Sequence, residues 1–131
     1  SLGRALIRVC DLMHAGDELP LAREDASMRD VLLVMAERRF GCVGIVDAEG
    51  ALTGIITDGD LRRHMDGLLS RTAANVMTRT PRVISPDALA EQAVAGMKDH
   101  KITCLFAVMP GGDGRAEGIL HIHDCLRAGV V

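Results

Sequence analysis

The ten residues GIITDGDLRR at positions 54–63 recur as GILHIHDCLR at positions 118–127, which is 64 positions later. Upstream of them, MAERRFGCVGIV at 35–46 is echoed by MKDHKITCLFAV at 97–108. The short stretch VMT at 76–78 similarly matches LMH at the start of the chain. Two copies are too few for a solenoid, which needs three or more repeats to bury its faces. The duplication therefore predicts two similar halves that pack on each other with pseudo-twofold symmetry, and the cleft between them is the expected ligand site.

Composition excludes several classes of protein. At 131 residues the chain fits one compact domain or two half-domains, and a hydrophobic content of 48% excludes disorder. Only 2% of the residues are aromatic and the net charge is −3, so neither base stacking nor a basic surface for nucleic acid is available. The apolar stretches are far shorter than the roughly 20 residues that span a bilayer. Nucleic acid and membrane are therefore excluded as partners.

The cysteines and the first residues bear on the cellular compartment and on whether the chain is part of a longer protein. The four cysteines form no Cys-x-x-Cys pair, so we expect free thiols in a reducing cytoplasm, with Cys42 and Cys104 buried as small hydrophobic residues. No secretory signal is visible. Because the chain begins with Ser-Leu-Gly rather than Met, it is expected to be a piece of a longer protein.

The order of elements is the same in both copies. In the first, SMRD at 27–30 resembles a capping box and predicts a helix ending near Phe40-Gly41, as apolar residues follow it at helical spacing. A strand at 43–46, a turn at 47–50, a strand at 52–57 and a helix capped by Asp58 and reaching about His64 complete the copy. In the second copy we expect a lead-in at 80–84, a helix starting at Pro86 and Asp87, strands at 105–108 and 118–121, and a helix from 122 to about 128. The fold class is therefore α+β, with two β-α-β-β-α repeats.

This order, with VMT at its start and the closing GIIT-x-x-DL, resembles the CBS domain, here as a tandem pair or Bateman module. The resemblance places the first CBS domain at 11–65, a linker at 66–74 and the second CBS domain at 75–131, with residues 1–10 as a tail from a preceding domain.

Three longer strings are similar to one subgroup of CBS proteins. DLMHAGDELP at 11–20, TDGDLRR at 57–63 and HIHDCLRAGVV at 121–131 resemble the carboxy-terminal CBS pair of arabinose 5-phosphate isomerases. The resemblance implies an amino-terminal sugar isomerase domain, absent here, and a place in the synthesis of Kdo, a sugar of lipopolysaccharide. Catalysis would belong to that absent domain, so no catalytic residue is assigned to this chain.

The repeated motif has chemistry suited to a nucleotide. A strand that turns directly into a helix exposes backbone N–H groups that attract phosphate. The Thr57 hydroxyl can add a hydrogen bond to phosphate, and the Asp60 carboxylate can accept from both hydroxyls of a ribose, as CBS pairs do at these positions. In the second copy Asp124 is retained and His121 replaces the threonine, so the two sites are expected to differ. Either aspartate could instead serve only to cap its helix.

Further candidates for ligand contact are polar residues near these motifs. His14 and Asp17 lie in the lead-in loop, Arg62 follows the first motif and His123 lies in the second. Lys101 and Thr103 precede the second apolar strand. Solvated surface positions are the alternative for all of them. His121, His123 and Asp124 also suggest a metal site. The spacing does not provide a convincing set of three ligands, so no metal site is assigned.

Three functions follow as hypotheses. The first is a regulatory module that binds a nucleotide or nucleotide sugar, with CMP-Kdo, the end product of the pathway, as a feedback ligand of the parent isomerase and AMP or ATP as alternatives. The second is a ligand-free module that dimerises the parent, since CBS pairs often associate as discs. The third is a small metal-dependent enzyme built on the histidines. No cofactor is expected in any but the last.

Overall fold

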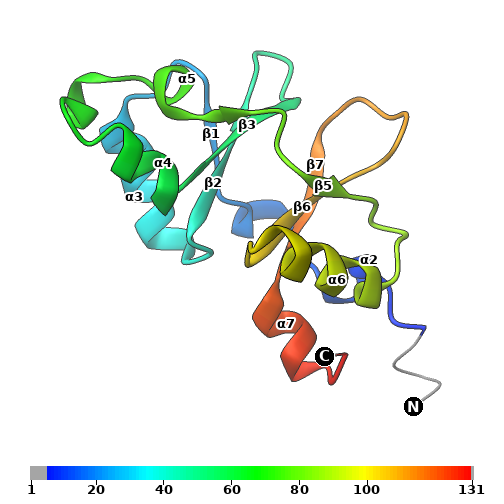
Figure 1. Cartoon of the computed structure of the whole chain (residues 1–131). Coiled ribbons are helices and arrows are strands. Elements are labelled where there is room, and N and C mark those ends of the chain that lie inside the picture. Colours follow the sequence, from blue (N-terminus) through cyan, green and yellow to red (C-terminus); the bar gives the residue numbers. More distant parts are fainter. Residues whose placement is uncertain (1–5, 131) are drawn as a thin grey trace. The chain divides into compact units, whose positions relative to one another are not determined.

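The computed structural model describes residues 6–130, which form two compact units (Figure 1). The continuous unit runs from Pro20 to Pro81. The composite unit joins the described residues up to Leu19 to those from Arg82 onward. Of the expected tail at 1–10, residues 1–5 lie outside the described part of the chain, as does Val131.

The continuous unit holds a sheet with the strand order β1-β2-β3-β4. Strand β1 (Leu21–Arg23) pairs parallel with β2 (Cys42–Val46), and α3 (Met28–Arg38) connects them. Antiparallel strand β3 (Leu52–Thr57) follows β2 and continues directly into α4 (Asp58–Arg63). Then come η2 (Leu68–Ser70), α5 (Ala73–Val76) and the short strand β4 (Thr78–Arg79), which closes the sheet beside β3.

The composite unit repeats this plan with a sheet of order β5-β6-β7. Its strands are β5 (Val83–Ile84), β6 (Cys104–Val108) and β7 (Ala116–His121), and its longer helices are α6 (Ala90–His100) and α7 (Ile122–Arg127). The lead-in of the chain supplies α2 (Val9–Leu12) and η1 (Gly16–Glu18). His14 pairs with Ile119 of β7, as Thr78 pairs with Ile55 of β3, so the lead-in occupies the position that β4 has in the other unit.

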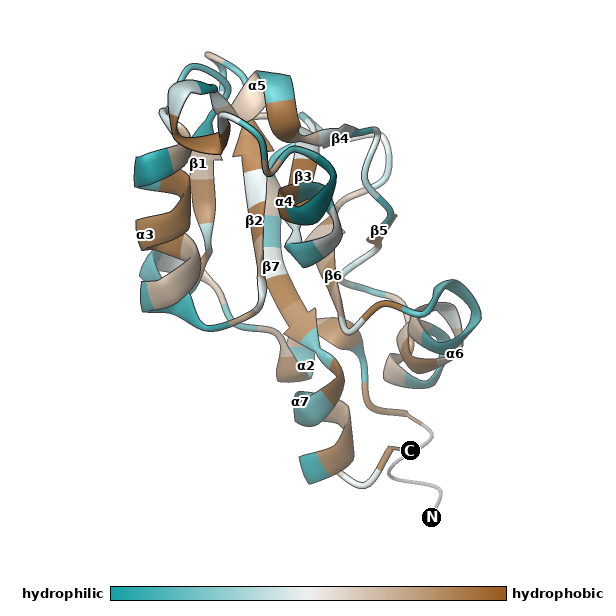
Figure 2. Ribbon diagram, turned by 60° about the vertical axis from the view of Figure 1, so that its left-hand side comes forward, coloured by the Kyte–Doolittle hydropathy of each residue, from teal (hydrophilic) through white to brown (hydrophobic). Residues whose placement is uncertain are grey.

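Each unit has its own hydrophobic core. The strands that carry these cores are mainly hydrophobic in Figure 2, whereas the helices show both apolar and polar residues. The core of the composite unit includes Val9 from the lead-in together with Val94, Met97, Leu105 and Leu120. The core of the continuous unit is built from Met28, Val31, Val43, Ile45, Ile56, Ala73, Val76 and Met77. Each lead-in helix, α2 or α5, therefore contributes to the core of the unit in which it lies.

A methionine lies against a strand glycine at equivalent places in the two units. A Cβ atom at Gly54 would lie 2.4 Å from the sulfur of Met77, and one at Gly118 would lie 2.4 Å from the sulfur of Met13. Both glycines open the repeated motif, and both methionines belong to the matching lead-in stretches. Glycine is needed here because any side chain would occupy the space that the methionine fills.

Two expected helix starts were wrong. The N-cap of α4 is Thr57, not Asp58, and the Thr57 backbone N–H donates to Asp60 at 2.9 Å. Helix α6 begins at Ala90 rather than at Pro86 and Asp87. The carbonyls of Pro86 and Ala88 accept hydrogen bonds from the backbone N–H groups of Cys10 and Val9, at 2.9 Å each. Residues 86–88 instead form a turn, in which the Ala88 N–H donates to the Ser85 carbonyl at 3.0 Å. The pairing of this turn with the lead-in is not revealed by the local sequence.

The expected α+β class is confirmed by two mixed sheets of four and three strands with connecting helices. Cys42 and Cys104 are buried, as expected for small hydrophobic positions. Across residues 6–130, no helix combines the length and the apolar character needed to cross a membrane.

Candidate functional site

The first candidate site surrounds Asp60, which lies at the junction of β3 and α4. This residue is only 2% exposed. One carboxylate oxygen accepts from the backbone N–H and the hydroxyl of Thr57, at 2.9 and 3.2 Å. The other accepts from the Thr78 hydroxyl at 2.6 Å and from the Arg63 guanidinium at 2.5 Å. A carboxylate offers about four lone-pair positions, so these four bonds use its acceptor capacity.

These contacts also determine how the Asp60 carboxylate titrates. Burial acts to raise its pKa, but the hydrogen bonds from Thr78, Thr57 and Arg63 outweigh burial and lower the pKa below the ordinary value. The carboxylate is therefore held ionised, and it ties β4 to the start of α4. These contacts stabilise the junction of β3, α4 and β4.

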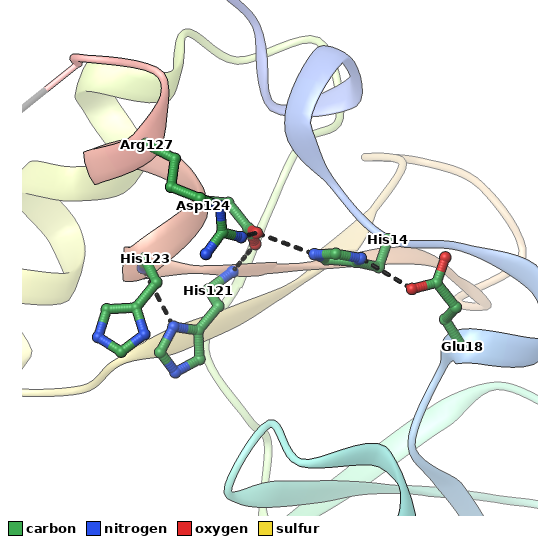
Figure 3. A network of polar contacts seen from close by, with 6 residues as sticks. All are labelled: His14, Glu18, His121, His123, Asp124 and Arg127. Carbon is green, nitrogen blue, oxygen red and sulfur yellow. Dashed lines mark hydrogen bonds and ion pairs between the residues drawn. The ribbon is translucent and has the colours of Figure 1, made fainter.

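The second candidate site surrounds Asp124, at the junction of β7 and α7 (Figure 3). This side chain is 6% exposed. The backbone N–H of His121 donates to one of its oxygens at 2.9 Å. The other oxygen faces the His14 Nε2 at 2.9 Å and accepts from the Arg127 guanidinium at 2.5 Å. Within residues 6–130, three hydrogen bonds thus reach Asp124, against four at Asp60.

The two sites share a frame but differ in their donors. The aspartate and the arginine three residues later occupy matching positions in both units. The two threonines that donate to Asp60 are replaced by histidines in the composite unit: His121 stands where Thr57 does, and His14 stands where Thr78 does. His123 also replaces Gly59. The expectation that the two sites differ is consistent with this arrangement, because histidines stand around Asp124 where Thr57, Gly59 and Thr78 stand around Asp60.

His121 caps helix α7 through its ring. Its Nδ1 accepts the backbone N–H of His123 at 3.1 Å, and the two imidazole rings lie 4.6 Å apart. Burial, together with the nearby His123, lowers the pKa of His121, although Asp124 acts in the opposite direction. The neutral ring with Nδ1 as acceptor must carry its hydrogen on Nε2. His121 is therefore a capping residue that also presents an N–H donor.

The remaining predicted residues lie outside these two hydrogen-bond networks. Asp17 is exposed in η1, and Arg62 is exposed on α4. Lys101 ends α6 in the left-handed conformation, with a φ of 55°, and is exposed. Thr103 is exposed too, but its carbonyl accepts the backbone N–H of Ile122 at 2.8 Å and so adjoins the start of α7.

Sequence reasoning missed four participants. Arg63 and Arg127 recur in the repeated motif, but the sequence favours a solvated helix position for Arg63, as it does for Arg62. Thr78 closes the lead-in stretch that matches the one containing His14. These three could have been found, since each occupies a position whose repeat equivalent lies 64 residues away in the chain. Glu18, which contacts the other nitrogen of His14 at 2.9 Å, has no counterpart in the repeat and left no such signal.

The histidines do not form a metal centre in this arrangement. Among residues 6–130, no group of three or more His, Cys, Asp or Glu side chains has a geometry that could hold a metal ion. Cys125, next to Asp124, is buried, and burial followed by the nearby carboxylate raises the pKa of its thiol. A thiol held protonated is a poor ligand and a poor nucleophile.

Two similar β-α-β-β-α units, each with a buried aspartate where an antiparallel strand continues into a helix, define a tandem repeat of one small α+β domain. The family model for the CBS domain matches residues 9–67 and 73–131. The chain belongs to the CBS domain family and carries two copies of the domain.

Within this family, the chain is similar to arabinose 5-phosphate isomerases. The chain is 42% identical over 135 aligned residues to the arabinose 5-phosphate isomerases KdsD of Yersinia pestis and Escherichia coli K12, covering 100% of this chain and 40% of each relative. It therefore spans about two fifths of the length of these relatives. Among solved structures it is similar to CBSX2 in complex with AMP, with a TM-score of 0.80, 24% identity and coverage of 95% of this chain and 96% of that one. The CBS pair of protein MJ0100 in complex with 5′-methylthioadenosine and S-adenosyl-L-methionine gives a TM-score of 0.79 at 23% identity, covering 93% and 94%.

Proposed function

We propose that this chain is a non-catalytic regulatory module that binds a nucleotide sugar, with CMP-Kdo as the preferred ligand, and so regulates a parent arabinose 5-phosphate isomerase in the cytoplasm. The observation that carries the proposal is the replacement of two threonines by histidines around Asp124, in a chain 42% identical to the isomerase KdsD. That the ligand lies in a cleft shared by the two repeats stays a prediction from the duplication.

The donors around Asp124 suit an anionic sugar nucleotide. CMP-Kdo carries a phosphate and a sugar carboxylate, so it needs more than one N–H donor. His121 presents its Nε2–H, and His123 is exposed beside it. The guanidinium of Arg127 uses one of its donors on Asp124 and is 68% exposed, so its other N–H groups remain for an anion.

The hydrogen-bond acceptors of the two candidate sites also favour the composite unit as the ligand-binding one. A ribose or sugar hydroxyl needs a carboxylate with an unused lone pair. Asp60 accepts four hydrogen bonds, which is about the capacity of a carboxylate, whereas Asp124 accepts three. A ligand hydroxyl can therefore join Asp124 without displacing a donor. This supports the composite unit as the one that binds the ligand.

Calorimetric titration of this chain with CMP-Kdo, CMP, AMP and ATP tests the proposal. CMP-Kdo should bind most tightly. The double variant His121→Thr, His123→Gly, which installs the residues of the continuous unit, should weaken that binding at least tenfold, or about 1.4 kcal/mol. A matched control is His100→Gln, an exposed histidine at the end of α6, which should bind as the unchanged chain does.

The alternative ligands and functions give different results. Tighter binding of AMP or ATP than of CMP-Kdo would make the module an adenine-nucleotide sensor, as the ligands of CBSX2 and MJ0100 suggest. Equal binding by the double variant would remove His121 and His123 from the site. Absence of binding by any nucleotide would contradict the proposal.

A ligand-free dimerisation module is the second candidate. Three apolar side chains of the continuous unit are exposed: Leu33 by 56%, Met65 by 61% and Leu69 by 66%. Sedimentation of the chain without ligand measures whether it forms a homodimer. Replacement of these three residues by Ser or Gln should then shift it to the monomer, which distinguishes this function from ligand binding.

A further inference from the structure

His14 lies between two carboxylates (Figure 3). Its Nε2 is 2.9 Å from an oxygen of Asp124, and its Nδ1 is 2.9 Å from an oxygen of Glu18. A neutral imidazole carries a hydrogen on only one ring nitrogen, whereas the imidazolium ion carries one on each. Carboxylates only accept, so both contacts can be hydrogen bonds only when His14 is protonated.

His14 lies shortly before the point where the chain passes from the composite unit into the continuous unit. Upstream, the backbone of His14 exchanges two hydrogen bonds of 2.9 Å with Ile119 of β7. Downstream, η1 contains Glu18, and the chain enters the continuous unit at Pro20. Residues 15–19 therefore form the end of the composite unit that connects to the continuous unit. The Glu18 contact ties this connection back to His14.

The charges around His14 favour its protonated form. Asp124 approaches it from α7 and Glu18 from η1, while Arg127 on α7 and His121 at the end of β7 oppose its charge. Burial alone would lower the pKa of His14, but the hydrogen bonds to the two carboxylates outweigh burial, and the pKa is raised above 6.5. The lowered pKa of His121 keeps that ring neutral near pH 7 and so limits its repulsion.

The equivalent position in the continuous unit lacks this property. There the Thr78 hydroxyl donates to Asp60 at 2.6 Å, and a hydroxyl does not titrate in this range. The contact between the lead-in and the buried aspartate thus occurs twice in the chain. In the composite unit it uses an imidazole, which titrates, and in the continuous unit a hydroxyl, which does not.

We propose that His14 is a proton-operated latch on the connection between the two units. Protonated, it bridges Asp124 and Glu18 and holds residues 15–19 against the rest of the composite unit. When it loses a proton it keeps only one of the two bonds. The bond to buried Asp124 persists, whereas the one to Glu18, whose side chain is 64% exposed, is released to water. The connection is therefore ordered below the pKa of His14 and mobile above it.

A titration of the five histidines by nuclear magnetic resonance tests the latch in the unmodified chain. The midpoint of His14 should lie above 6.5, and the backbone order parameters of residues 15–19 should fall as the pH rises through that midpoint. Glu18→Gln should lower the midpoint, because a neutral amide replaces a carboxylate. Asp17→Asn removes a charge from the same turn, but not one that meets a ring nitrogen, and should leave the midpoint within about 0.2 units.

His14→Thr reproduces the version found at Thr78. It retains a donor for Asp124 but should make the order of residues 15–19 independent of pH. The latch is overturned if the His14 midpoint is 6.5 or lower, if Glu18→Gln leaves it unchanged, or if residues 15–19 keep the same order across the titration. The first and third readouts use the unmodified chain, so they decide the question even if a variant fails to fold. None depends on the ligand, so they also hold if the proposed function is wrong.

Discussion

At the level of single residues, two neighbouring aspartates of one helix turn have very different environments. Asp58 is exposed, whereas Asp60 is buried and accepts four hydrogen bonds that join β3, α4 and β4. The sequence makes both look like helix-capping residues, because Asp is favoured at these positions. The strand β4, which brings Thr78 to the Asp60 carboxylate from 18 positions away, adds a contact that no local pattern reveals.

We expect Asp60→Ala to lower the free energy of unfolding by about 2–3 kcal/mol, since charge-assisted hydrogen bonds are lost and buried donors are left without an acceptor. Asp58→Ala is the control and should cost less than about 0.5 kcal/mol, as for an ordinary surface change. Urea denaturation at pH 7 measures both. Similar losses for the two variants would contradict the structural role of Asp60.

The same residue should contribute to acid sensitivity. The pKa of Asp60 in the folded chain lies below the ordinary value of 3.8 for this side chain. Its contribution is therefore fully present above the unfolded pKa and is lost as the pH falls through the folded one. Asp60→Asn should show a smaller loss of stability between pH 5 and about pH 2–3 than the unmodified chain, measured by urea denaturation across that range.

The pKa of His121 is shifted in the opposite direction to that of His14, so its contribution to stability should depend on pH in the opposite sense. Its pKa is lowered in the folded state, and protonation of Nδ1 would break the cap on the His123 N–H. Its contribution is therefore present above the ordinary histidine pKa of 6.5 and is lost as the pH falls through the folded value. His121→Thr should be less destabilised than the unmodified chain between pH 7 and pH 5 in thermal denaturation. An equal loss in both would mean that the cap does not titrate.

At the level of elements, each lead-in is locked to a strand by a methionine lying on a glycine. The two contacts are alike in their sulfur distances but differ in what else is near. Around Gly54 the three nearest atoms all belong to the flexible side chain of Met77. Around Gly118 the backbone oxygen of His14 would lie 2.9 Å from an added Cβ, and a paired backbone cannot move aside easily.

Gly118→Ala should therefore cost more stability than Gly54→Ala, with overpacking costs of about 1–3 kcal/mol. Adding Met77→Ala to Gly54→Ala should recover part of the loss, because it removes the sulfur and the Cγ atom that would clash. Adding Met13→Ala to Gly118→Ala should recover less, since the His14 carbonyl remains. Double-mutant cycles from urea denaturation measure both couplings. Equal recovery in the two units would contradict the difference in backbone contact.

At the level of the whole molecule, one unit is built from a single stretch of the chain and the other from two separate stretches. The continuous unit draws its entire core from residues 20–81, whereas the core of the composite unit takes Val9 from the lead-in and the rest from beyond residue 82. Folding of the composite unit therefore requires contacts between segments that are far apart in sequence, which close slowly and cost more loop entropy.

Residues 20–81 expressed alone should fold, whereas residues 82–131 alone should not, because Val9 and the Met13 contact would be missing. Dispersed amide resonances and a cooperative thermal transition are the criteria. Adding a peptide of residues 6–19 to the second fragment should restore its folded spectrum. A folded fragment 82–131 without the peptide would show that the lead-in is dispensable.

The sequence by itself determined the duplication, the α+β class and the order of the elements, because helix and strand periodicity and turn residues are local signals. It also located Asp60 and Asp124 as equivalent residues at strand–helix junctions. The tertiary structure decided what each one does. The hydrogen bond between His14 and Asp124 joins residues 110 positions apart, and the pairing of residues 9–10 with 86–88 moved the start of α6. Such contacts depend on which lead-in packs on which sheet, and no periodicity within a short window encodes that choice.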